Sequence, residues 1–203
     1  MKRITTGTEN FKEFMDKNYY YVDKTMLIDD VLSDKVMLYT RPRRFGKTLN
    51  MSMLYYFFSN QEKENAYLFE GLNVSKHQHL MLHQNQYPVI FLSLKDMKSL
   101  NYLEQIQQFA YIMKIIILQH LNLFDSPLID ESDKKTLNDL RFLRADPIQL
   151  KNSLSMLSRC LYQHYHQKVI ILIDEYDVPL QSAYQHDYYD EMVDFIRSVF
   201  SSA

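Results

Sequence analysis

The sequence predicts an α/β domain whose parallel sheet is covered by helices on both faces. Three short apolar segments, at residues 36–39, 88–94 and 169–173, have the length and composition of buried strands. Longer segments with apolar residues at helical spacing separate them. Strands that alternate with helices favour parallel pairing, because each helix returns the chain to the same end of the sheet.

Composition limits the classes to which the protein can belong. With 203 residues, of which 46% are hydrophobic, the chain has enough apolar material for one α/β domain with a helical insert. The net charge of -2 argues against a general basic coat for nucleic acid. The single cysteine, Cys160, fits a reducing compartment, and no signal peptide or membrane-spanning run is present. We therefore expect a cytoplasmic protein without a membrane partner.

The pattern in the first half of the chain predicts a helix, a strand, a loop and a second helix. Asp23 or Thr25 can cap a short helix, and the strand at residues 36–39 follows it. A loop over residues 40–46 then leads into a helix that starts near Lys47. The apolar face of this second helix is built by Leu49, Met53, Leu54, Phe57 and Phe58.

The second half holds a helical insert, which we place at about residues 100–167, between two strands. A long helix with an apolar stripe from Leu103 to Leu121 follows the strand at 88–94. Asp146-Pro147 predicts the start of another helix, which extends to Tyr165, because Asp caps a helix and Pro suits its first position. The strand at 169–173 and a last helix over 188–202 complete the pattern.

The segment between the first strand and the next helix has the features of a phosphate-binding loop. It reads Arg41-Pro42-Arg43-Arg44-Phe45-Gly46-Lys47-Thr48. Helix starts attract anions through unpaired N–H groups and the helix dipole, and Gly46 lets the backbone approach an oxyanion. The Lys47 ammonium can reach the β- and γ-phosphates, and the Thr48 hydroxyl can bind Mg²⁺. An ordinary helix start with an exposed lysine is the alternative, since Arg41 stands where the general motif has its first glycine.

Two acids after the last strand favour the phosphate-binding interpretation. Asp174 and Glu175 directly follow the apolar strand at 169–173. At the carboxyl end of a strand, Asp174 would bind Mg²⁺ and Glu175 would orient the attacking water, as in ATPases with a P-loop. The residues expected to contact nucleotide or its phosphates are Arg43, Arg44, Phe45, Gly46, Lys47, Thr48 and Leu49. Thr48 and Asp174 are the expected metal ligands, and Lys47 and Glu175 the expected catalytic residues.

Three strings of residues resemble the predicted AAA-ATPase-like family: residues 20–25, residues 40–48 and residues 171–177. The resemblance covers essentially all 203 residues, and it implies a three-layer P-loop NTPase core that binds ATP and Mg²⁺. In this family an arginine at the first glycine position is normal. The resemblance also implies an association with a PD-(D/E)XK nuclease-like domain, and hence with DNA, in a longer protein.

One expected strand is missing from the pattern. ATPases with a catalytic Glu after the second motif have a further strand between the P-loop strand and the Asp-Glu strand, and none follows Asp174. We therefore expect one AAA-ATPase-like P-loop domain over residues 1–203 that is truncated at its C-terminus. The complete protein would be a Mg²⁺-dependent ATPase that couples nucleotide state to an attached or partner domain. This chain alone would bind nucleotide weakly and would turn it over weakly or not at all.

Two other functions remain open. One is a nucleotide-binding or degenerate interaction module without turnover. The other is direct nucleic-acid binding through Arg41, Arg43 and Arg44. The aromatic run Tyr19-Tyr20-Tyr21 can either contact the adenine base or pack within the domain, and packing is the more common role of such a run. The sequence does not separate ATP from GTP or fix the oligomeric state.

Overall fold

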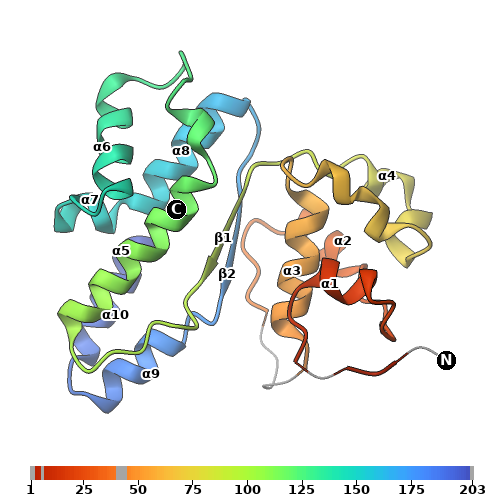
Figure 1. The fold of residues 1–203 in the computed structure, drawn as a ribbon, viewed down its shortest axis with the longest axis horizontal. Coiled ribbons are helices and arrows are strands. Elements are labelled where there is room, and N and C mark those ends of the chain that lie inside the picture. Colours follow the sequence, from red (N-terminus) through yellow and green to blue (C-terminus); the bar gives the residue numbers. More distant parts are fainter. Residues whose placement is uncertain (1–2, 6, 40–44, 202–203) are drawn as a thin grey trace. The chain divides into compact units, whose positions relative to one another are not determined.

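The structure is a computed structural model that describes residues 3–5, 7–39 and 45–201 (Figure 1). The chain divides into two compact units, residues 1–89 and residues 90–203, which are described separately below. The single P-loop domain that the sequence predicts would span both units, and it stays a prediction. In the described part of the chain, no helix has both the length and the apolar character needed to cross a bilayer.

The first unit is built around helix α3 (Lys47–Phe58), which packs against α1 (Phe11–Asp16) and the 3-10 helix η1 (Lys63–Phe69). Its remaining elements are α2 (Leu27–Ser33), the 3-10 helix η2 (Asn73–Lys76) and α4 (Gln78–Met81). The rings of Phe11 and Phe57 lie 5.3 and 5.1 Å from that of Phe69, and all three are fully buried. Burial of large aromatic rings is therefore a main source of stability in this unit.

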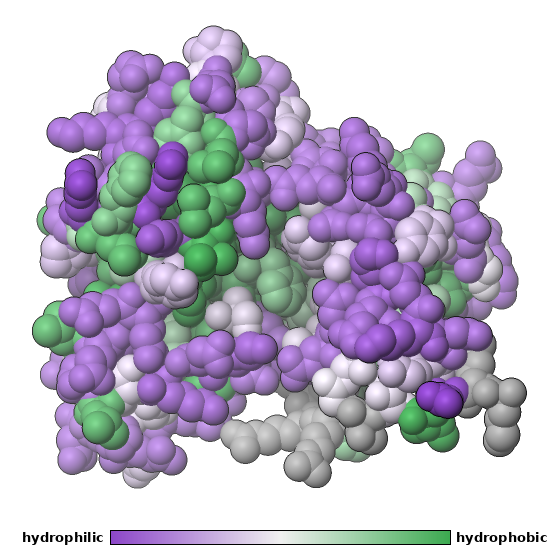
Figure 2. Space-filling model, in the orientation of Figure 1, coloured by the Kyte–Doolittle hydropathy of each residue, from purple (hydrophilic) through white to green (hydrophobic). Residues whose placement is uncertain are grey.

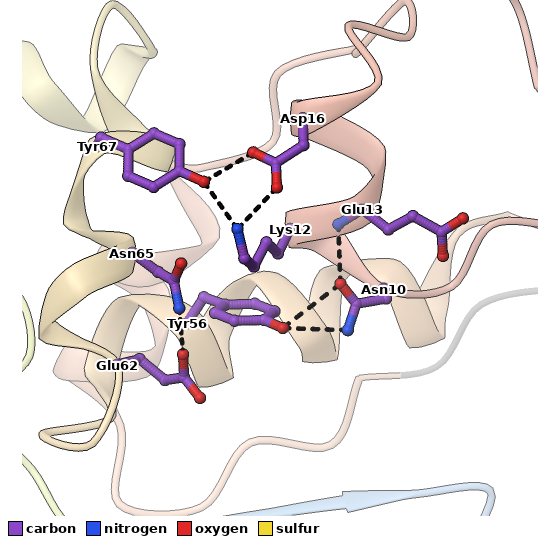
Figure 3. A network of polar contacts seen from close by, with 8 residues as sticks. All are labelled: Asn10, Lys12, Glu13, Asp16, Tyr56, Glu62, Asn65 and Tyr67. Atoms are coloured by element: carbon purple, nitrogen blue, oxygen red, sulfur yellow. Dashed lines mark hydrogen bonds and ion pairs between the residues drawn. The ribbon is translucent and has the colours of Figure 1, made fainter.

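Polar contacts join the outer surfaces of α1, α3 and η1 (Figure 3). The Lys12 ammonium donates to the Asp16 carboxylate at 2.7 Å and to the Tyr67 hydroxyl at 2.8 Å, and that hydroxyl donates to Asp16 at 2.7 Å. Asn10 caps α1 by accepting from the backbone N–H of Glu13, and its amide donates to the Tyr56 hydroxyl at 3.1 Å. The network fixes α1 against its two neighbours.

The aromatic run at residues 19–21 packs mainly within the first unit. Tyr19 and Tyr21 lie edge-on to Phe14, with centroids 5.5 and 5.9 Å apart, and Tyr21 also contacts Phe11 at 5.4 Å. Burial raises the pKa of the Tyr21 hydroxyl. Tyr20 remains 59% exposed. These contacts support the packing interpretation of the run for Tyr19 and Tyr21.

No strand forms at residues 36–39, so that prediction is wrong. Val36 is 90% exposed and Leu38 is 70% exposed, where a buried strand would hide both. A strand needs a hydrogen-bonded neighbour. Within the described first unit, the recorded bridges are Arg3 with Tyr19 and Ser59 with Tyr87, and neither includes this segment. Apolar composition alone therefore does not make a strand here.

The second unit holds the sheet, a parallel pair of β1 (Val89–Ser93) and β2 (Ile170–Asp174), with β1 beginning at the unit boundary. Its helices are α5 (Tyr102–Leu118), α6 (Glu131–Arg141), α7 (Pro147–Lys151), α8 (Ser153–Tyr165), α9 (Val178–Gln185) and α10 (Tyr189–Ser201), with the 3-10 turn η3 (Leu121–Leu123). The parallel pair and the helices are compatible with the predicted α/β class. A full three-layer core needs more strands than the described two, so that finer prediction stays a prediction.

The predicted helix over 147–165 is two helices. Asp146 caps the helix as expected and forms a capping box with Gln149, but α7 ends at Lys151 and α8 begins at Ser153, directly after Asn152. The Asn152 side chain donates to the carbonyl of Ile148 at 2.9 Å, which satisfies an acceptor at the end of α7. Side-chain competition of this kind is why Asn disfavours helix interiors.

The core of the second unit lies between α5, α8, α10 and the sheet, with Phe109, Leu157, Phe195 and Leu92 fully or almost fully buried. The outer face of α5 is different. Figure 2 shows hydrophobic side chains at the surface over this helix. Its residues Leu103, Ile115 and Leu118 are 66, 39 and 39% exposed. The apolar residues of α5 thus extend beyond the part of the helix that is buried in the core.

Candidate functional site

The loop half of the predicted site ends on a glycine in the left-handed conformation. Gly46 has φ 75° and ψ 26° and stands at the N-cap position of α3, where its carbonyl accepts from the backbone N–H of Asn50 at 3.0 Å. A glycine adopts this conformation without the steric cost that a Cβ brings. Lys47, Thr48 and Leu49 therefore form the first turn of a long helix, as predicted. Arg41, Arg43 and Arg44 lie outside the described residues.

The first turn of α3 is suited to bind an anion. The first N–H groups of any α-helix lack intrahelical acceptors, and the helix dipole adds partial positive charge there. Lys47, Thr48 and Leu49 are half-buried, and Phe45 is 58% exposed. The Lys47 ammonium and the Thr48 hydroxyl belong to the turn itself. Phosphate is the group that such a helix start binds in many proteins.

Two polar contacts anchor α3, and the sequence analysis missed both. Asn50, which is 2% exposed, donates its side-chain amide to the Tyr39 hydroxyl at 3.0 Å and so ties α3 to the chain just before the loop. The Ser52 hydroxyl accepts from the backbone N–H of Phe11 at 2.9 Å, which ties α3 to α1. A polar residue on the apolar face of a predicted helix was the available signal for Asn50.

The motif residues Asp23 and Thr25 have structural contacts. The Asp23 carboxylate accepts from the N–H and hydroxyl of Thr25 and from the N–H of Asn73 at 2.6 Å, and Thr25 accepts from the N–H of Val74 at 3.1 Å. Burial raises the pKa of Asp23, but these hydrogen bonds outweigh it and hold the pKa below its usual value. The two side chains thereby fix the start of η2.

The acidic half of the site lies at the carboxyl end of β2, as predicted. Asp174 is 1% exposed, and its carboxylate accepts from the backbone N–H of Glu175 at 3.0 Å. The Asp174 carbonyl accepts from the N–H of Leu94 at 3.0 Å, which extends the pairing with the chain beyond β1. Glu175 follows with φ 54°, in the left-handed region that a non-glycine residue adopts only at an energetic cost.

The chain turns directly from Glu175 into α9, a helix that the sequence analysis missed. The Glu175 carbonyl accepts from the N–H of Val178 at 3.1 Å, and the Asp177 carboxylate accepts from the Gln181 side chain at 2.7 Å. Asp177 is thus a helix-start residue with a structural contact. Its signal was present in the sequence, because Asp177 with Pro179 resembles the Asp146-Pro147 start that was recognised.

The structure therefore organises two local half-sites. The first unit places Gly46, Lys47 and Thr48 on one helix turn, and the second places Asp174 and Glu175 at one strand end. Each half is described within its own unit. The Thr48 hydroxyl and the Asp174 carboxylate are hard oxygen donors, the type that Mg²⁺ prefers, so both fit a role as magnesium ligands.

A protein-family model that is described as a predicted AAA-ATPase matches residues 5–203. Comparisons with curated proteins and with solved structures gave no significant match. The family match spans both half-sites and nearly the entire chain. The chain therefore belongs to the predicted AAA-ATPase family.

Proposed function

We propose that the chain is a P-loop module that binds ATP with Mg²⁺ and hydrolyses it. The observation that carries the proposal is the left-handed Gly46 directly before α3, with Lys47 and Thr48 in the first turn of that helix. This arrangement presents a backbone cradle, an ammonium and a hydroxyl to one anion. Membership of the predicted AAA-ATPase family supports the choice of nucleotide as that anion.

The acidic half-site supplies the remaining groups that hydrolysis needs. In this proposal Asp174 and Thr48 hold Mg²⁺, which neutralises charge on the phosphates, while Glu175 accepts a proton from the attacking water. Lys47, and Arg43 or Arg44, stabilise charge on the transferred phosphoryl group. The proposed activity belongs to a three-layer P-loop core that couples nucleotide state to an attached or partner domain, such as a nuclease-like domain acting on DNA.

A nucleotide-dependent interaction module without turnover is the second candidate. The observation that favours it is the short sheet: within the described residues two strands pair, and residues 36–39 before the loop form none. A phosphate-binding turn still functions as a binding site on such a scaffold. Hydrolysis also requires that a water molecule is placed precisely against the γ-phosphate, which demands a more complete scaffold than binding does.

Binding and phosphate release, measured on the same preparations, test the proposal. Affinities for fluorescent ATP and GTP analogues are measured with and without Mg²⁺, and phosphate release is followed at saturating nucleotide. We expect Lys47→Ala to weaken Mg-ATP binding at least about tenfold, since it removes a charge-assisted contact to phosphate. The matched control is Lys135→Ala, on the exposed face of α6.

Each outcome separates the candidates. Binding that depends on Lys47, together with phosphate release, supports the ATPase. The same binding without phosphate release favours the interaction module. Wild-type affinity in Lys47→Ala would remove the basis of both candidates. Displacement of nucleotide by duplex DNA would instead favour nucleic-acid binding through Arg41, Arg43 and Arg44.

A further inference from the structure

A buried polar cluster in the second unit centres on Gln105, a residue of α5 that is 0% exposed. Its side-chain N–H groups donate to the carbonyls of Met97 at 2.9 Å and Pro179 at 3.2 Å. Its carbonyl oxygen accepts from the backbone N–H of Ser99 at 3.1 Å and lies 2.8 Å from the Tyr188 hydroxyl. Both ends of this amide are thus satisfied in the core.

Ser182 and Tyr188 complete the cluster. The Ser182 hydroxyl donates to the Ser99 carbonyl at 3.1 Å and lies 3.2 Å from the Ser99 N–H. The Tyr188 hydroxyl lies 2.6 Å from the same carbonyl, so its single proton is shared between Ser99 and Gln105. The side chains of Gln105, Ser182 and Tyr188 are at most 7% exposed, and Ser99 takes part through its backbone N–H and carbonyl. The cluster therefore joins the chain after β1, α5, α9 and the start of α10.

Such a cluster holds its members in one arrangement. A buried amide or hydroxyl without partners is costly, so the low-energy state is the one in which every donor and acceptor is matched. Two of the matched groups, the Pro179 carbonyl and the Ser182 hydroxyl, lie on α9. The cluster thereby fixes the first turns of α9 against α5.

Glu175 lies between two points at which hydrogen bonds anchor the chain. Before it, the Asp174 carbonyl accepts from Leu94, and after it, the Pro179 carbonyl accepts from Gln105. The φ of 54° at Glu175 is unfavourable for a residue with a side chain, and such a conformation persists when the surrounding structure imposes it. The two anchors hold the chain on both sides of this turn.

We propose that Gln105, with Tyr188 and Ser182, is a positioning residue for the Glu175 turn. By fixing α9, the cluster keeps Glu175 left-handed and so sets the direction in which its carboxylate leaves the end of β2. The inference rests on the proposed function for its catalytic consequence, because Glu175 is there the group that accepts the proton. Its structural part, the clamping of the turn, is independent of that function.

Two variants of the full chain test the proposal. Gln105→Leu keeps similar volume but leaves the Met97 and Pro179 carbonyls without this donor. Tyr188→Phe removes a single hydroxyl and leaves Ser99 and Gln105 with their other donors. We therefore expect this milder variant to fold even if Gln105→Leu does not. The control is Leu137→Ala, a fully buried apolar site on α6 that takes no part in the hydrogen bonds of the cluster and whose truncation should destabilise the same unit.

Three quantities are measured for each variant: the hydrogen-exchange rate of the Val178 N–H, which bonds to the Glu175 carbonyl, the affinity for Mg-ATP, and kcat. For Gln105→Leu we expect exchange at Val178 to rise at least about tenfold over the Leu137→Ala control, because local opening becomes easier. We expect kcat to fall at least about tenfold, while affinity changes less than about twofold, because misplacement of a reacting group affects the chemical step. Tyr188→Phe should show both effects more weakly.

The outcomes keep the two proposals apart. Exchange at Val178 that matches the control in both variants would overturn the positioning role. Faster exchange with unchanged kcat would overturn its catalytic consequence. If the wild-type chain shows no turnover dependent on Lys47, the proposed ATPase function fails, while the exchange measurement still decides whether the cluster holds the Glu175 turn.

Discussion

Both halves of the predicted nucleotide site contain a left-handed residue, but the two residues differ in kind. Gly46, at φ 75°, precedes α3, and Glu175, at φ 54°, follows β2. The glycine adopts this conformation freely, and a Cβ placed there would meet none of the residues that the structure describes within 4 Å. The glutamate adopts it against its preference, between a strand pairing and a buried polar cluster. The loop half is thus shaped by residue choice and the acidic half by its surroundings.

The largest expected effect comes from the different steps in which the two halves take part, hydrolysis for Glu175 and nucleotide binding for Lys47. We expect Glu175→Gln to lower phosphate release by about 100-fold or more, which is the usual loss when a general base is removed, with little change in nucleotide affinity. Lys47→Ala should instead weaken binding. Steady-state kinetics and nucleotide titration measure both, with Glu191→Gln on the exposed face of α10 as the control. Equal effects of both variants on affinity would break the division of roles.

Acid should weaken the second unit before the first. Burial lowers the pKa of His120 to about 4, so the folded state favours the neutral ring, whereas the unfolded chain protonates near pH 6.5. The contribution of neutral His120 to the free energy of unfolding is therefore fully present above about pH 6.5. About 2–3 kcal/mol of it is lost as the pH drops towards 4. Urea unfolding at pH 7 and pH 4.5 measures this loss. His120→Asn should remove most of it and His186→Asn, at an exposed site, should not. A pH-independent midpoint in the wild type contradicts the prediction.

The first unit should respond at lower pH and through a different group. The folded state lowers the pKa of Asp23, so its contribution is present above about pH 4 and is lost as the pH falls through the folded-state pKa. At neutral pH we expect Asp23→Ala to destabilise the unit by about 1–2 kcal/mol, because the N–H of Asn73 loses its acceptor. Hydrogen exchange at the Val74 N–H reports this loss. Asp34→Ala, at an exposed site after α2, is the control, and equal effects of the two variants would contradict a specific role for Asp23.

The smallest effect tests the comparison most directly. Gly46→Ala should cost about 1 kcal/mol, because alanine resists φ 75° even where its Cβ meets none of the described residues. Glu175→Gly should be neutral or stabilising by up to about 1 kcal/mol, because it removes the strain although it loses the carboxylate. Thermal unfolding of both variants measures the pair. Changes of the same sign would mean that the two left-handed turns are held in the same way.

Sequence patterns predicted the elements that carry the half-sites, because those patterns are local. The glycine before Lys47 and the apolar run before Asp174 each specify a helix start or a strand end from neighbouring residues alone. The φ of Glu175 was not predictable in this way, because Leu94 and Gln105, which hold the chain on both sides of the turn, lie at distant positions in the sequence. The strand at residues 36–39 failed for the same reason, since a strand depends on a pairing partner that composition does not reveal.

The pairing of β1 with β2 also has a consequence for how the second unit folds. Helices α5 to α8 all lie between the two strands in the chain, so the hydrogen bond from Leu94 to Asp174 closes a long loop. Closure of such a loop has an entropic cost that grows with the length of flexible chain it encloses. Helices that form first shorten that flexible length. The strand end that carries Asp174 should therefore be completed late, after the helical insert has brought its own two ends together.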